Sequence, residues 1–128
     1  MCIRDSYTPL LAPQLYRDAG LKPEDIDVAE IYDCFTHTVL LGLEGLGFCP
    51  KGEGGPFAAS GAIALNGSIP TNTSGGMLSE AYIHGMNVVA EAVLQLRGEG
   101  GNTQVPDAEV AVVTSGASTI GSACIMTI

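Results

Sequence analysis

The sequence predicts an α/β domain in which helices are layered on a short sheet. Three observations predict this fold class. Segments with helical spacing alternate with short apolar strands, a glycine-rich segment separates two of the helices, and two apolar strands close the chain. The 128 residues are 46% hydrophobic and 15% charged, which is enough apolar material for one packed core and argues against disorder.

The first part of the chain predicts a helix, a strand and a second helix. Residues 9–19 carry apolar side chains at helical spacing and end at Gly20, a typical helix stop. A polar connection leads to a short apolar strand over residues 28–31. Asp33 is then placed to cap a helix over residues 35–46, and we expect this role for it rather than a catalytic one.

The second part predicts a loop, the longest helix and two antiparallel strands. Residues 50–76 hold much of the glycine of the chain, so we expect an irregular segment with a function. Apolar residues over 77–96 cover more than half of a helix circumference, which predicts a helix buried on several sides. Residues 109–114 and 123–128 are apolar strands joined through residues 115–122.

The charge balance excludes two classes of partner. The net charge is −9 and no basic stripe is present, so we expect neither nucleic acid nor an anionic membrane surface as partner. No apolar run is long enough to span a membrane. The four cysteines form no C-x-x-C pair and no spacing typical of zinc ligands, so no metal site is predicted. Reduced thiols in the cytoplasm are expected.

Residues 1–6 are expected to be foreign to the fold. Their sequence, Met-Cys-Ile-Arg-Asp-Ser, is what a common transposase-adapter sequence encodes, so we interpret them as a sequencing artefact. An ordinary N-terminus is the alternative. The domain is then expected over residues 7–128, as a fragment of a longer chain.

Three stretches follow one another in an order that is known from one protein family. Residues 30–35, Glu-Ile-Tyr-Asp-Cys-Phe, resemble the N-E-A-F segment of thiolases, or H-D-C-F in the sterol-carrier-protein-X type. Residues 49–55 resemble the C-P-x-G-x-G-G loop of that type, and residues 72–82 are similar to its N-P-S-G-G-L-I-S-K-G-H-P segment. The resemblance implies the C-terminal half of a thiolase fold, with layered α/β/α architecture, a mixed sheet and a buried helix.

Departures from the family pattern fall on its functional positions. Tyr32 stands where thiolases place the Asn or His that helps to hold the thioester oxygen, and Tyr82 stands where they place the His of G-H-P. The later C-x-G segment reads Ser115-Gly116-Ala117, so its acid/base cysteine is missing. Tyrosine at both positions resembles the thiolase-like steroid side-chain aldolases, which are also called lipid-transfer-protein thiolases.

That resemblance implies a retro-aldol reaction on a coenzyme A thioester. A β-hydroxyacyl-CoA with its hydroxyl on a branched carbon would split into a ketone and a short acyl-CoA, without a bound cofactor. The family implies a homodimer formed through the missing half of the chain, and a small zinc-ribbon/OB-fold partner subunit. The residues that would contact the CoA phosphates stay unassigned.

A retro-aldol reaction needs a base for the hydroxyl proton, an acid for the enolate carbon, and donors for the enolate oxygen. Tyrosine can both donate and accept a proton, but its ordinary pKa of about 10 makes it a poor base at neutral pH. We expect the backbone at Gly75 and Gly76, the helix start that follows them, and a backbone donor at Gly116 to support the site. Our hypothesis makes Tyr82 the base and Tyr32 the acid or oxyanion donor.

Three alternatives stay open at this point. Both tyrosines are also the kind of residue that fills a core. The protein can instead be a thiolase that transfers acyl groups with a nucleophilic cysteine in the missing half. It can also be a non-catalytic subunit that binds acyl-CoA or lipid. We do not favour a nucleophile pair formed by Cys34 and His37. In each case the isolated chain is expected to be inactive.

Overall fold

In the computed structural model, residues 6–81, 83–117 and 119–128 are described. β2 (Val110–Ala117) is the central strand of a three-stranded sheet. It pairs in parallel with β1 (Val28–Glu30) and antiparallel with β3 (Ile120–Thr127). The sheet is therefore mixed, and the two strands at the end of the chain are antiparallel as predicted.

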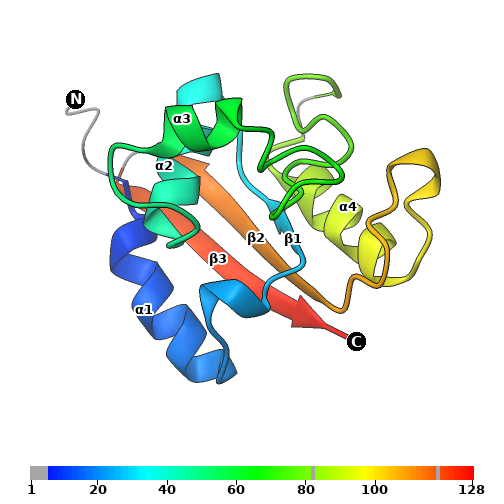
Figure 1. Ribbon diagram of the computed structural model, residues 1–128, viewed down its shortest axis with the longest axis horizontal. Coiled ribbons are helices and arrows are strands. Elements are labelled where there is room, and N and C mark those ends of the chain that lie inside the picture. Colours follow the sequence, from blue (N-terminus) through cyan, green and yellow to red (C-terminus); the bar gives the residue numbers. More distant parts are fainter. Residues whose placement is uncertain (1–5, 82, 118) are drawn as a thin grey trace.

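Helices cover both faces of this sheet (Figure 1). α1 (Thr8–Ala19) and α2 (Thr36–Gly45) lie on one face, and α4 (Met86–Leu96) lies on the other. Alternate residues of β2 enter the two cores, as the period of two in a strand requires. One core contains Ala12, Tyr16, Ile31, Leu43, Leu46 and Val112. The other contains Val28, Val88, Ala92, Leu96, Ala111 and Val113. The predicted α/β/α layering is thus confirmed.

The first helix and the first strand lie close to their predicted bounds. α1 ends before Gly20, whose φ of 70° is the left-handed backbone that terminates many helices. Two 3₁₀ helices, Pro23–Asp25 and Gly101–Thr103, lie in connections between the larger elements. In the described part of the chain, no helix has both the length and the apolar character needed to cross a membrane.

The helix predicted over residues 77–96 is wrong in its first half. The described residues between 77 and 85 form turns, a bend and irregular backbone. The helix α4 begins only at Met86. Gly85 has a φ of 83° and His84 a φ of 52°, and left-handed backbone at two successive residues interrupts an α-helix. Some of the apolar side chains that the sequence assigned to the buried face of this helix lie in solvent. Leu78 is 58% exposed and Met86 is 59% exposed. Within this chain α4 buries one face, on the sheet.

The irregular segment predicted over residues 50–76 contains one short helix, α3 (Gly54–Ala59). The remainder is built of turns. It returns to the sheet at Thr71, which forms an isolated parallel bridge with Ala29 of β1. The end of this segment is therefore fixed next to the strand that leads to Tyr32.

The two C-terminal strands are longer than predicted. Ser115 pairs with Ser122 and Gly116 with Gly121, inside the stretch that the sequence predicts as a connection. Glycine and serine are typical of loops, so the pattern stops the strands too early. The ladder continues because each residue has a backbone partner directly opposite on the neighbouring strand.

Candidate functional site

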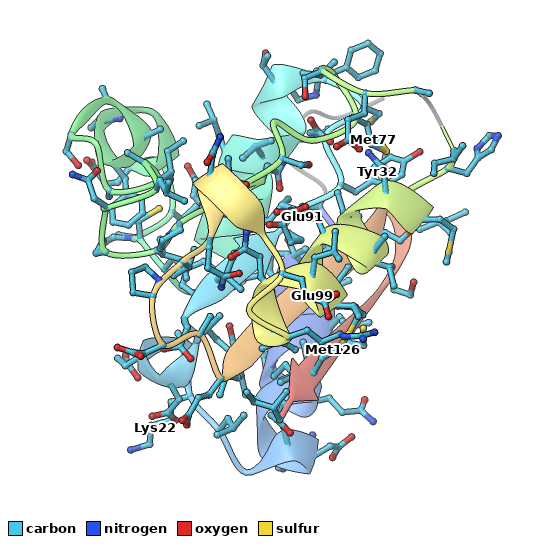
Figure 2. The ribbon with its side chains drawn as sticks, turned by 90° about the vertical axis from the view of Figure 1, so that its right-hand side faces the viewer. Lys22, Tyr32, Met77, Glu91, Glu99 and Met126 are labelled. Carbon is cyan, nitrogen blue, oxygen red and sulfur yellow. The ribbon has the colours of Figure 1, made fainter. Side chains whose placement is uncertain are left out.

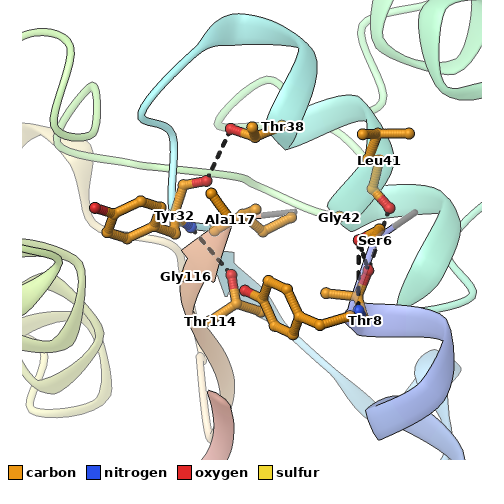
Figure 3. A pocket seen from close by; sticks show the side chains of 11 residues that line it. Ser6, Thr8, Tyr32, Thr38, Leu41, Gly42, Thr114, Gly116 and Ala117 are labelled. Carbon is orange, nitrogen blue, oxygen red and sulfur yellow. Dashed lines mark hydrogen bonds between the residues drawn. The ribbon is translucent and has the colours of Figure 1, made fainter. Parts of the chain in front are cut away.

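Tyr32 follows β1 and lies beside the start of α4 (Figure 2). Its N–H donates to Oγ1 of the buried Thr114 over 3.0 Å, and its carbonyl accepts a hydrogen bond from the hydroxyl of Thr38 at 3.1 Å. These bonds fix the backbone of Tyr32 from β2 and from α2. The half-buried ring extends away from Thr8 and Leu41, with its hydroxyl at the far end (Figure 3).

The backbone at Gly85 packs against the ring of Tyr32. A Cβ at Gly85 would lie 3.0 Å from Cδ2 of Tyr32 and 3.0 Å from Oγ of Ser115, so this close approach favours glycine. Tyr32 and Ser115 therefore meet Gly85 where the parallel strands β1 and β2 end. Tyr82 lies outside the described residues, so its proximity to Tyr32 stays a prediction.

The carboxylate of Asp33 binds the turn after Gly76. Its Oδ1 accepts the N–H of Met77 at 2.9 Å, and its Oδ2 accepts the N–H of Leu78 at 3.3 Å. The predicted role of Asp33 as a cap is wrong, because α2 begins after Phe35 with no side-chain cap. Asp33 is 3% exposed, and a buried carboxylate needs donors that these two backbone groups supply.

Gly75 and Gly76 form the turn itself, with φ values of 94° and 68°. A Cβ at Gly76 would contact the carboxylate of Asp33 and lie 2.9 Å from Nδ2 of Asn72. The N–H of Gly75 donates to the carbonyl of Asn72 at 2.8 Å. The predicted support from a helix that starts after the two glycines is wrong, since α4 begins at Met86. A donor role for the backbone at Gly76 stays a prediction.

Gly116 lies in β2, opposite Gly121 of β3. Its φ is 122°, and a Cβ there would contact the carbonyl oxygen of Ile120. Together with Tyr32 and Thr8 it lines a cavity of about 20 Å³ (Figure 3). That volume suits one water molecule and not an acyl chain. The expected role of Gly116 as a backbone donor stays a prediction.

A larger hollow of about 400 Å³ opens between α2 and the irregular segment that ends in the glycine turn. Its lining combines four apolar side chains with four polar ones and one glycine: Val39, Leu40, Ile63 and Leu78, then Asp33, Thr36, Thr71 and Asn72, and Gly75. Among the side chains that the structure describes, no three or more His, Cys, Asp or Glu residues gather in a way that could hold a metal ion. The ring of His37 stacks on Phe35, with 5.6 Å between the ring centroids.

Sequence reasoning missed the structural part that Asn72 plays. Its Oδ1 accepts the N–H of Ile31 at 2.7 Å, and its Nδ2 donates to the carbonyl of Ile31 at 2.9 Å. This clamp holds the backbone immediately before Tyr32. The φ of Asn72 is 51°, which asparagine tolerates better than most residues. Its place at the head of the Asn-Thr-Ser-Gly-Gly motif is the signal that marks it.

Sequence reasoning also missed Tyr7 as a neighbour of the candidate site. It is buried, lines the same small cavity as Tyr32, and packs its ring against Gly121 of β3. Burial raises the pKa of the Tyr7 hydroxyl. Nothing in the local sequence marks this residue, because its neighbours come from distant parts of the chain, among them Tyr32 and, more than 100 residues later, Gly121.

Comparisons with known proteins agree with this fold. The chain is 51% identical over 107 residues to the 17-hydroxy-3-oxo-4-pregnene-20-carboxyl-CoA lyase of Mycobacterium tuberculosis, covering 84% of this chain and 28% of the relative. It is 50% identical over 107 residues to the steroid side-chain-cleaving aldolase of Thermomonospora curvata, covering 84% of this chain and 27% of the relative. The solved structure of an Ltp2-ChsH2(DUF35) aldolase superimposes with a TM-score of 0.88 at 45% identity, covering 94% of this chain and 31% of that one.

The chain thus spans less than a third of the length of these relatives. The family model described as thiolase C-terminal domain-like matches residues 8–128. The family resemblance inferred from the three sequence motifs is therefore confirmed, together with the fold class that it implied. On this evidence the chain belongs to the thiolase C-terminal domain-like family.

Proposed function

We propose that the chain is the C-terminal part of an enzyme that cleaves a carbon–carbon bond of a β-hydroxyacyl-CoA by a retro-aldol reaction. One observation carries the proposal. Tyr32 stands at a position where thiolases place Asn or His, and two hydrogen bonds hold its backbone. The chain that carries this tyrosine is about 50% identical to proteins named as a lyase and an aldolase.

In the proposed reaction Tyr82 removes the proton of the β-hydroxyl group. The oxygen then forms the carbonyl of a ketone, the bond between the α and β carbons breaks, and its electron pair passes to the thioester as an enolate. Tyr32 donates a proton to the α carbon, which gives the short acyl-CoA, or it donates a hydrogen bond to the enolate oxygen while the α carbon takes its proton from water. Rigid placement favours this role, because catalytic donors act best when they need no reorganisation.

The substrate class follows from the same relatives. The names of two relatives refer to a carboxyl-CoA compound and to a steroid side chain, so a steroid CoA thioester is the first substrate to test. The name of the matched structure joins two components, which supports a partner subunit, and the family resemblance implies that this subunit is a small zinc-ribbon/OB-fold protein. We further propose a homodimer. We also propose a location in the cytoplasm, a reducing compartment in which Cys34, Cys49 and Cys124 stay free thiols.

The test uses the full-length protein, with the partner subunit, and a branched β-hydroxyacyl-CoA. Mass spectrometry of the products should give a ketone and a short acyl-CoA in equal amounts. The intact mass of the quenched protein should be unchanged. An acyl group trapped on a cysteine would instead indicate the thiolase alternative. Binding of the thioester without any turnover would indicate a non-catalytic subunit.

A further inference from the structure

Two glutamates from different elements meet at one threonine hydroxyl. Oγ1 of Thr73 lies 2.8 Å from Oε1 of Glu30, at the end of β1, and 2.6 Å from Oε1 of Glu91, in α4. Both side chains are buried, with Glu30 0% exposed and Glu91 8% exposed. Figure 2 labels Glu91 on α4, the helix that packs on the face of the sheet opposite α1.

Two further donors reach this cluster, the backbone N–H of Thr73 and the side-chain amide of Gln95. The N–H of Thr73 donates to Oε1 of Glu30 at 3.1 Å. Nε2 of Gln95, one turn further along α4, has two protons and three acceptors within reach: Oε1 of Glu91 at 2.8 Å, the carbonyl of Thr103 at 2.9 Å and, at the longest distance, Oγ1 of Thr73 at 3.1 Å. The Thr73 hydroxyl has a single proton, so it can donate to only one of the two carboxyl groups. The other short oxygen–oxygen contact then requires a proton on a carboxyl oxygen.

The surroundings of Glu30 favour the same conclusion. The charged groups that act on it are Glu91 from α4 and Asp33 from the segment after β1, and both are acidic. Its second oxygen, Oε2, is buried without a hydrogen-bond partner among the described residues, which is costly for an ionised carboxylate. Burial above all, followed by the two acidic neighbours, raises the pKa of Glu30 to about 8, although the hydrogen bonds from Thr73 oppose this shift.

The cluster is joined to the candidate site on both sides. Glu30 stands two residues before Tyr32. Thr73 directly follows Asn72, whose side chain clamps the backbone of Ile31, and precedes the glycine turn held by Asp33. A change in the position of Thr73 would therefore move both segments that form the site.

We propose that Glu30, Thr73 and Glu91 share one proton and so hold the turn of the candidate site, which makes Glu30 and Glu91 positioning residues for the proposed retro-aldol reaction. The positioning part rests on the proposed function, whereas the shared proton does not. Loss of the proton leaves two carboxylates facing one hydroxyl, and their repulsion displaces Thr73 and the turn. We therefore expect kcat to fall as Glu30 ionises in the alkaline range.

Activity as a function of pH tests the positioning role in the full-length protein with its partner. Glu30→Gln replaces the protonated acid by a neutral group of the same shape, so the alkaline fall of kcat should be lost. Glu91→Gln leaves a single carboxylate at the Thr73 hydroxyl, so the repulsion, and with it the alkaline fall of kcat, should also be lost. The matched control, Glu99→Gln, changes a half-exposed glutamate that pairs with Arg97, and should keep the wild-type profile. An unchanged alkaline fall in both network variants would overturn the positioning role.

Infrared spectroscopy of the same full-length proteins tests the shared proton independently of activity. A carbonyl band of a buried, protonated carboxylic acid should be present at pH 6 and shift in D₂O. It should disappear above pH 8, and it should be absent in Glu30→Gln. Absence of the band in the wild type would overturn the network, whatever the activity. A normal band in a protein without retro-aldol activity would support the network and count against the proposed function alone.

Discussion

The carboxylate of Asp33 accepts a hydrogen bond from the backbone N–H of Met77 over 2.9 Å, between residues 44 positions apart in the sequence. Together with the clamp of Asn72 on Ile31, it ties the segment after β1 to the glycine turn. The candidate site is therefore assembled by buried polar contacts between two segments with little regular structure. Its geometry should respond strongly to changes in these contacts and weakly to changes elsewhere on the surface.

Asp33→Asn should destabilise the full-length protein and lower its activity. An amide can accept one of the two backbone hydrogen bonds, but its NH₂ group then faces the N–H of Leu78. An unsatisfied buried donor costs about 1–3 kcal/mol, which denaturant unfolding should detect. Asp18→Asn, at an exposed position of α1, is the matched control and should stay within about 0.5 kcal/mol of the wild type. Equal effects of the two substitutions would contradict the structural role of Asp33.

Gly76→Ala should be far more damaging than Gly98→Ala. The two glycines have nearly the same φ, 68° and 69°, so both substitutions carry the same left-handed strain of about 1–2 kcal/mol. At Gly98 an added Cβ meets nothing within 4 Å, whereas at Gly76 it meets the carboxylate of Asp33. The difference between the two melting temperatures isolates the contact from the strain. Equal melting temperatures would show that the turn relaxes without cost.

Stability should fall as pH rises through the neutral range, and Glu30→Gln should remove part of this fall. The pKa of Glu30 is raised from its ordinary value of 4.5 to about 8, so between these values the folded protein keeps a proton that the unfolded chain releases. The contribution of Glu30 to the free energy of unfolding is therefore fully present below about pH 4.5 and is lost as the pH rises to about 8. Melting temperatures measured from pH 5 to pH 9 check this. A wild type and a Glu30→Gln variant with parallel curves would exclude the shift.

The isolated chain should aggregate. Large apolar side chains lie in solvent on several elements, with Leu10 83% exposed on α1 and Ile120 82% exposed on β3. Apolar side chains that are exposed in this number favour aggregation, and we propose that further parts of a longer chain cover them. Light scattering after size-exclusion chromatography measures the outcome. A monomer that stays soluble and melts cooperatively would contradict this expectation.

Local pattern was sufficient for much of the fold. Gly20 ends the first helix and the apolar strands pair as expected, because these features depend on neighbouring residues. The helix over 77–96 was predicted too long, because periodicity counts apolar side chains without telling which of them face this core. Leu78 and Met86 do not.

The site was harder to predict than the fold. The family motifs led to Tyr32 and to the glycine turn, but not to their partners. Asp33 follows a strand and precedes a helix, so local rules assign it to a cap, although its donors come from a distant turn. The proton-sharing cluster at Thr73 joins a strand, a turn and a helix. Contacts of this kind appear only once the chain is folded.

The central claim is that two tyrosines carry the retro-aldol reaction, and single Tyr→Phe substitutions in the full-length protein test it most directly. Tyr82→Phe and Tyr32→Phe should each lower kcat by about 10²–10⁴-fold, the usual contribution of a general acid or base. Tyr16→Phe is the control, because the buried hydroxyl of Tyr16 donates to the carbonyl of Leu46 at 3.0 Å and lines no part of the site. It should lower stability by about 1 kcal/mol and leave kcat unchanged. Full activity of the Tyr82→Phe protein would contradict the account.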